Sequence, residues 1–158
     1  MKILVIDDNP HKMRQIVDFL KHDFAAAEIV ERRSYQSGLK AALLEDPQII
    51  LLDMTMPTFD VGGRETGGRE RRYAGQQILR QLRRKDAKAF IIVVTQFEKF
   101  GEGDEQVTLD QLRDGLSREF EERYLGAVYY QAADSKWREE LRAMVARVVS
   151  ITTRGTDA

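Results

Sequence analysis

Residues 51–60 read LLDMTMPTFD, and this stretch decides how the chain is interpreted. The apolar run from Ile49 to Leu52 ends directly on the carboxylate of Asp53, and the pair Met56-Pro57 begins three residues later. A short run of branched apolar residues is typical of a strand that is buried on both faces. An aspartate after such a strand is usually a turn or helix-cap residue, so its neighbours in space decide whether Asp53 carries chemistry.

The composition limits the classes of function that need to be considered. The chain has 158 residues, of which 42 % are apolar and 32 % charged, with a net charge of −1. These values are typical of one globular domain without a general attraction to nucleic acid or membranes. The chain has no cysteine and only two histidines, which excludes disulfides and argues against a thiolate or histidine metal site. It has no signal-peptide pattern and no apolar run as long as a membrane span, so we expect a cytoplasmic protein.

Short apolar runs alternate with helical patterns along the whole chain. Strands are expected at residues 3–6, 27–30, 49–52, 90–94 and 127–130. A helix is expected after each strand, because apolar residues recur there at helical spacing, as in Met13, Ile16, Val17 and Leu20. This alternation predicts an α/β fold: a five-stranded parallel sheet, doubly wound by helices in the flavodoxin-like manner. We expect a single domain over residues 1–151, followed by a tail at 152–158.

Polar side chains follow several of the predicted strands. Asp7 and Asp8 come after the first strand, Asp53 ends the third, and Thr95 ends the fourth. The carboxyl ends of parallel strands meet at one edge of the sheet, where ligands of such folds bind. Carboxylates gathered there would repel one another, and a hard cation such as Mg²⁺, which prefers oxygen ligands, would relieve that repulsion. A carboxylate beside the ion is then a candidate acceptor for a phosphoryl group.

The sequence resembles the response-regulator receiver domain of two-component signalling. The resemblance rests on ILVIDD at 3–8, LLDMTMP at 51–57, VVT at 93–95 and GAVYY at 126–130. It implies that Asp53 is the phosphoacceptor and that Asp8 and Asp53 bind Mg²⁺, with Asp7 assisting and Thr55 contributing its backbone carbonyl. Thr95 would be the switch hydroxyl, and Tyr130 the aromatic side chain that reorients with it.

The resemblance fails at one functional position. The family carries a lysine after the fifth strand, where it pairs with the acceptor carboxylate and then with the phosphoryl group. The corresponding residue here is Ala133, and the nearest lysine is Lys136, which we consider a candidate substitute. A second departure is Gln96, which stands where the family usually has a small residue.

Two segments are longer than the family requires. Residues 61–74, VGGRETGGRERRYA, form an inserted loop that is rich in glycine and arginine, and arginines suit phosphate, nucleic acid or an acidic partner. This loop is the only candidate for nucleic-acid binding, which we do not otherwise expect. The region 96–125 is enlarged as well: it contains the acidic run GEGDE at 101–105, and we expect a lengthened helix from about Thr108 to Arg123.

The favoured hypothesis is a stand-alone receiver in phosphorelay signalling, of the kind typical of bacteria. A histidine kinase or phosphotransfer protein would donate the phosphoryl group, and a downstream protein target would read the result. Apart from self-catalysed phosphorylation and dephosphorylation of Asp53, no enzymatic activity is expected.

Two alternatives remain at this point. A pseudo-receiver that lacks the lysine would act as a constitutive interaction module, independent of phosphorylation. A phosphohydrolase of the haloacid-dehalogenase type would need a second aspartate two residues after Asp53, where the sequence has Thr55.

Overall fold

A five-stranded parallel sheet forms the centre of the chain. A computed structural model gives the structure and describes residues 1–60, 70–71, 74–100 and 103–156. The sheet has the order β2-β1-β3-β6-β9 and contains β1 (Lys2–Ile6), β2 (Glu28–Arg32), β3 (Ile49–Leu52), β6 (Phe90–Thr95) and β9 (Tyr124–Tyr129). Taken in chain order, this is the 2-1-3-4-5 arrangement of flavodoxin-like folds. The fold predicted from the sequence is therefore confirmed.

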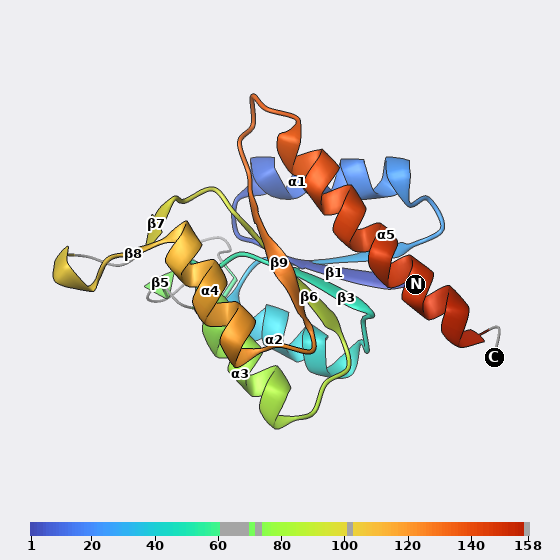
Figure 1. Cartoon of the computed structure of the whole chain (residues 1–158), viewed down its shortest axis with the longest axis horizontal. Helices are drawn as coiled ribbons and strands as arrows, with labels where there is room; N and C mark the ends of the chain where they lie inside the picture. Colours follow the sequence, from blue (N-terminus) through green and yellow to red (C-terminus); the bar gives the residue numbers. More distant parts are fainter. Residues whose placement is uncertain (61–69, 72–73, 101–102, 157–158) are drawn as a thin grey trace.

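Helices cover both faces of the sheet, and each layer has its own apolar core (Figure 1). One face carries α1 (Pro10–Asp23) and α5 (Lys136–Thr156); the other carries α2 (Tyr35–Leu44), α3 (Ala74–Arg84) and α4 (Leu109–Glu119). Alternate side chains of each strand point to opposite faces. In β1, for example, Ile3 and Val5 pack towards α1 and α5, whereas Leu4 and Ile6 pack towards α2 and α3.

The strand order reverses between β1 and β3, and this position locates the site. Ile6 lies opposite Leu52 in the register, and the backbone N–H of Asp53 donates to the carbonyl of Ile6 at 3.0 Å. The residues that follow these two strands must therefore emerge side by side. A crevice at such a reversal is the usual ligand site of open α/β sheets.

Helix α1 begins at a strong cap directly after the acidic pair. The side chain of Asn9 accepts from the backbone N–H groups of His11 and Lys12, each at 3.1 Å, and Pro10 occupies the first turn. Asparagine at the N-cap followed by proline is a favoured helix start. The cap fixes the first turn of α1, and with it Lys12, against the edge of the sheet that carries Asp7.

Both enlarged segments contribute to short antiparallel ladders that were not predicted from the sequence. The first contains β5 (Glu70–Arg71), which pairs antiparallel with β4 (Met56–Pro57); residues 61–69 and 72–73 lie outside the described residues. In the second, β7 (Lys99–Phe100) pairs with β8 (Val107–Thr108), and a short 3₁₀ turn spans Gly103–Glu105. In Figure 1 both small ladders lie at the left, the end of the molecule where β3 and β6 end.

Two boundaries predicted from the sequence were wrong. Helix α4 is not lengthened: Thr108 caps it, it ends at Glu119, and a turn then leads to β9, which begins at Tyr124. The extra length of region 96–125 thus lies largely in the β7–β8 ladder. At the other end of the chain, α5 continues to Thr156, so residues 152–156 extend the helix and are not a tail.

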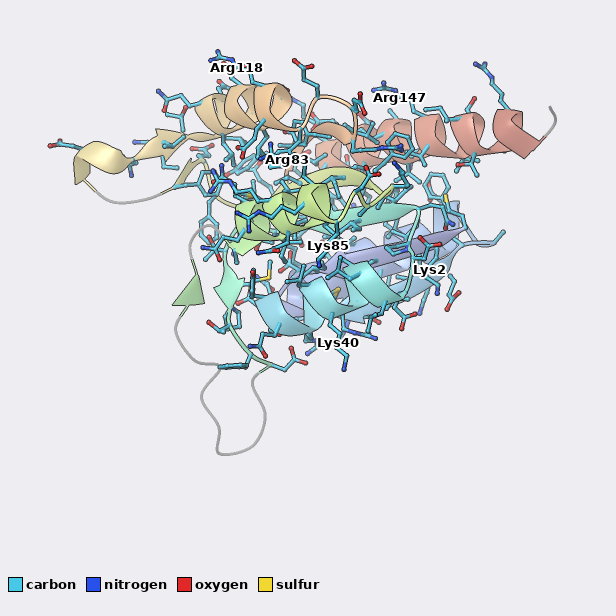
Figure 2. All side chains as sticks on the ribbon, turned by 90° about the horizontal axis from the view of Figure 1, so that it is seen from below. Lys2, Lys40, Arg83, Lys85, Arg118 and Arg147 are labelled. Carbon is cyan, nitrogen blue, oxygen red and sulfur yellow. The ribbon has the colours of Figure 1, made fainter. Side chains whose placement is uncertain are left out.

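Charged side chains of the helices mostly point away from the layers. Figure 2 shows this for Lys40 on α2 and Arg118 on α4, both of which are exposed. Among the described helices, none is both long and apolar enough to span a membrane.

Gly75, in the first turn of α3, allows this helix to approach the end of β3 closely. Its backbone N–H donates to the carbonyl of Met54 at 3.1 Å. A Cβ atom at this position would lie 2.5 Å from the backbone oxygen of Asp53 and 3.0 Å from the Cα of Met54. Since both are backbone atoms, relief would require a shift of the chain at Asp53.

We therefore expect Gly75→Ala to lower the free energy of unfolding by about 1–3 kcal/mol, the usual effect of overpacking. Gly115→Ala in α4 is the matched control, because a Cβ there meets nothing within 4 Å and alanine gains up to about 1 kcal/mol in a helix. Urea denaturation of both variants tests this. Equal stability of the two variants would contradict the close approach at Gly75.

Candidate functional site

Three carboxylates converge at the carboxyl edge of the sheet. Oxygen atoms of Asp7, Asp8 and Asp53 all lie within 4.8 Å of one another. Asp7 and Asp8 follow β1 and Asp53 follows β3, so the strand reversal itself brings them together. Such a group of oxygen ligands suits a hard divalent cation that retains several waters. The chemistry of the cluster therefore fits Mg²⁺.

Asp53 and Asp7 are buried, and each carboxylate already has polar partners. Asp53 is 3 % exposed and its Oδ1 accepts from the backbone N–H of Met54 at 2.8 Å. Asp7 is 2 % exposed and its Oδ1 accepts from the backbone N–H of Asn9 at 2.9 Å. In both residues this leaves Oδ2 facing the interior of the site.

Lys12 fills that interior. Its side chain is completely buried, and its Nζ lies 2.6 Å from Oδ2 of Asp7 and 3.4 Å from Oδ2 of Asp53. The same ammonium group donates to the backbone carbonyl of Val94, at the end of β6, at 2.7 Å. Of the lysines and arginines that the structure describes, Lys12 is the one with a buried side chain. One cation from α1 thus joins the ends of β1, β3 and β6.

This position is unfavourable for a lysine unless specific partners stabilise its charge. The first turn of a helix is the positive end of its dipole, and a buried ammonium loses its hydration. Two short polar contacts and a longer ion pair compensate for both effects. The sequence analysis did not identify Lys12 as a site residue. Its spacing of four from Ile16 and eight from Leu20 on the apolar face of α1 was the available signal.

Burial dominates the electrostatics of Asp53. Loss of hydration raises the pKa of its carboxyl to about 7, with Lys12 lowering it and Asp7 and Asp8 raising it further. The negative charges of the cluster outnumber the one ammonium group in contact with them. A bound cation would favour the ionised form of Asp53 because it adds positive charge to the site.

The other predicted site residues lie around this cluster. Thr95 is fully buried at the end of β6, and its Oγ1 accepts from the backbone N–H of Phe97 at 3.2 Å. Gln96 spans the edge of the site, since its Oε1 accepts from Nδ2 of Asn9 at 3.2 Å. Thr55, half-buried, follows Asp53 by two residues, so its backbone is near the cluster in sequence.

Tyr130 lies on the α1 and α5 face of the sheet. Its hydroxyl donates to Oε1 of Gln15 in α1 at 2.7 Å, and its ring centroid lies 6.0 Å from Nζ of Lys12. The ring also packs on Trp137, with centroids 5.1 Å apart. The adjacent Tyr129 lies on the opposite, α4 face, where it is half-buried.

Lys136, the expected substitute for the missing lysine, is exposed. It is the first residue of α5, and its backbone N–H donates to the Asp134 carboxylate at 2.8 Å. Its side chain contributes to a surface hollow that Glu98 and Glu140 also line. Ala133, at the family position of the lysine, is exposed too. The lysine in contact with Asp53 is therefore Lys12 and not Lys136.

Comparison with known proteins identifies the family of the chain. The family model of the response regulator receiver domain matches residues 3–125. The chain belongs to this family. The Detocs response regulatory protein DtcB of Enterobacter cloacae is 29 % identical over 143 residues, which cover 89 % of this chain and 95 % of DtcB. The uncharacterized protein y4jR of Sinorhizobium fredii is 28 % identical, covering 90 % of this chain and 95 % of y4jR.

A solved receiver domain supports the fold assignment. The signal receiver domain from Vibrio parahaemolyticus superimposes with a TM-score of 0.64 at 15 % identity, covering 98 % of this chain and 94 % of that one. Receiver domains are signalling modules, and the family membership supports a signalling role for this chain. Receiver domains bind Mg²⁺ at an acidic pocket, and the cluster of Asp7, Asp8 and Asp53 has the ligands to hold such an ion.

The raised pKa of Asp53 predicts how stability depends on pH without metal. A carboxyl whose pKa is raised on folding contributes stability that is present below its unfolded pKa and is lost as pH rises through the folded value. In EDTA, the free energy of unfolding of the wild type should therefore fall by about 1 kcal/mol between pH 6 and pH 8, relative to that of Asp53→Asn. Asp18→Asn, at an exposed carboxylate of α1, is the charge-matched control. Its stability should depend on pH in the same way as that of the wild type.

Urea denaturation at both pH values measures this difference. Parallel pH profiles of the wild type and Asp53→Asn would show that the carboxyl group of Asp53 is not perturbed in the folded chain.

Proposed function

We propose that the protein accepts a phosphoryl group on Asp53 in a Mg²⁺-dependent reaction and signals through protein–protein contacts. The observation that carries this proposal is the convergence of Asp7, Asp8 and Asp53 at the strand reversal, with oxygens within 4.8 Å. Asp53 is the central member, since it ends the strand next to β1 and its Oδ2 faces the buried ammonium of Lys12.

The residues of the cluster divide naturally between holding a metal and accepting phosphate. Asp8 and Asp53 would hold Mg²⁺, with the backbone carbonyl of Thr55 as a further oxygen ligand. Asp7 would assist, because Lys12 and the N–H of Asn9 already occupy its two oxygens. When bound, Mg²⁺ supplies positive charge to the phosphoryl oxygens during transfer.

The transfer itself is a nucleophilic displacement at phosphorus. A carboxylate oxygen of Asp53 attacks the phosphorus of a phosphohistidine or acyl phosphate donor. The P–N or P–O bond of the donor breaks, and the leaving group keeps the electron pair. The product is an acyl phosphate on Asp53. Thr95 stands at the end of β6 as the candidate hydroxyl that binds the new group.

The donor would be a histidine kinase or a phosphotransfer protein, and a downstream protein would read the phosphorylated form. The similarity to DtcB, whose name describes a response regulatory protein, supports a signalling role of this kind. A location in the cytoplasm, where such kinases expose their phosphohistidine, belongs to the same proposal. The constitutive pseudo-receiver is the competing function, and it is favoured by Ala133 at the lysine position.

Phosphorylation by acetyl phosphate distinguishes the two functions. With Mg²⁺, intact-mass spectrometry should find one added phosphoryl group in the wild type and none in Asp53→Ala. Removing the metal with EDTA should reduce the labelled fraction at least tenfold, because the transferred charge loses its main counter-charge. Asp60→Ala, near β4 and outside the cluster, is the control and should be labelled like the wild type.

An absence of the adduct in the wild type, under conditions that label another receiver domain, would favour the constitutive module. An adduct that persists in Asp53→Ala would place the acceptor elsewhere in the chain.

A further inference from the structure

We propose that Lys12 is the catalytic cation of this receiver. In this reading, a lysine in the first turn of α1 binds the phosphoryl group on Asp53, in place of a lysine after β9. The inference deepens the proposed function and rests on it.

Of the three polar contacts of Lys12, the one with Asp53 is the longest. The bonds to Asp7 at 2.6 Å and to the Val94 carbonyl at 2.7 Å are short, whereas the distance to Asp53 is 3.4 Å. An ammonium group has three donors, and an N–H···O bond is usually 2.7–3.2 Å long. Two donors therefore anchor Lys12, and the third points towards the carboxylate that receives phosphate.

A cation in this position would assist phosphoryl transfer alongside Mg²⁺. As a carboxylate oxygen of Asp53 forms its bond to phosphorus, negative charge is spread over the phosphoryl oxygens and the leaving group. A fixed ammonium in a buried site stabilises that charge strongly, because little reorganisation is needed. Lys12 is fixed by its two anchors and by the Asn9 cap, which holds the turn that carries it.

The surroundings of Lys12 argue against two simpler explanations. A lysine that only neutralised Asp7 would not need to reach β6 and the side of Asp53. A surface lysine would be exposed, like Lys136, whereas the side chain of Lys12 is fully buried. The family position of the lysine, Ala133, cannot supply a charge, and the described part of the chain buries no other lysine or arginine.

The test compares the rates at which acetyl phosphate and Mg²⁺ label the full chain. Lys12→Met keeps most of the unbranched side chain and removes its charge, and we expect the rate of phosphorylation to fall about 100-fold, as when one oxyanion donor is lost. Lys136→Met is the matched control and should keep the wild-type rate. Circular dichroism and Mg²⁺ titration establish that Lys12→Met is folded and binds the ion.

A second measurement does not depend on any variant. In a crystal structure of the wild-type chain with Mg²⁺ and beryllofluoride, Nζ of Lys12 should lie about 3 Å from a fluorine atom on Asp53. Contact of that fluorine with Lys136, and none with Lys12, would overturn the inference.

The outcomes separate the two proposals. A wild type that is labelled as fast as Lys12→Met overturns the role of Lys12 and leaves phosphorylation of Asp53 intact. A wild type that takes no phosphoryl group overturns the proposed function, and the inference with it. A 100-fold fall in the rate of phosphorylation that is confined to Lys12→Met, together with the contact between Lys12 and fluorine, supports both the role of Lys12 and the phosphorylation of Asp53.

Discussion

The buried ammonium of Lys12 is the interaction on which the site depends. Without it, the carboxylates of Asp7 and Asp53 would face each other in a region that excludes water, and both would lose their nearest counter-charge. The removal of one partner from a buried ion pair usually costs about 3–5 kcal/mol, because the other charge is left uncompensated. The ion pair is therefore part of the architecture of the sheet edge, and not an addition to a finished fold.

Several other features of the structure position this ammonium group and its two carboxylate partners. The strand reversal brings Asp7 and Asp53 together, and the register of β1 with β3 fixes their separation. Asn9 caps α1 and links to Gln96, so the loops after β1 and β6 are joined across the site. Gly75 lets α3 approach the other side of Asp53. These contacts are local in space but come from four separate parts of the sequence.

The sequence was sufficient for the fold because the signals were periodic. The run Ile49 to Leu52 predicted β3 with its observed bounds, and the strand-end aspartates followed from the topology. Lys12 was missed because a charged residue in an amphipathic helix is usually assigned to the solvent face, although its spacing from Ile16 places it on the apolar one. Region 96–125 was misjudged for a different reason: a two-residue ladder such as β7 with β8 depends on pairing between residues apart in the sequence and leaves no periodic pattern.

The element that carries the lysine also determines which parts of the structure respond when the charge at Asp53 changes. A lysine after β9 would pull on the turn at residues 131–135, whereas Lys12 is held by the backbone of β6 and by the first turn of α1. The same helix carries Gln15, which binds the hydroxyl of Tyr130, and the ring of Tyr130 packs on Trp137 of α5. In this receiver, the layer formed by α1 and α5 is consequently connected to the side chain of the acceptor through Lys12, whereas α3 approaches its backbone.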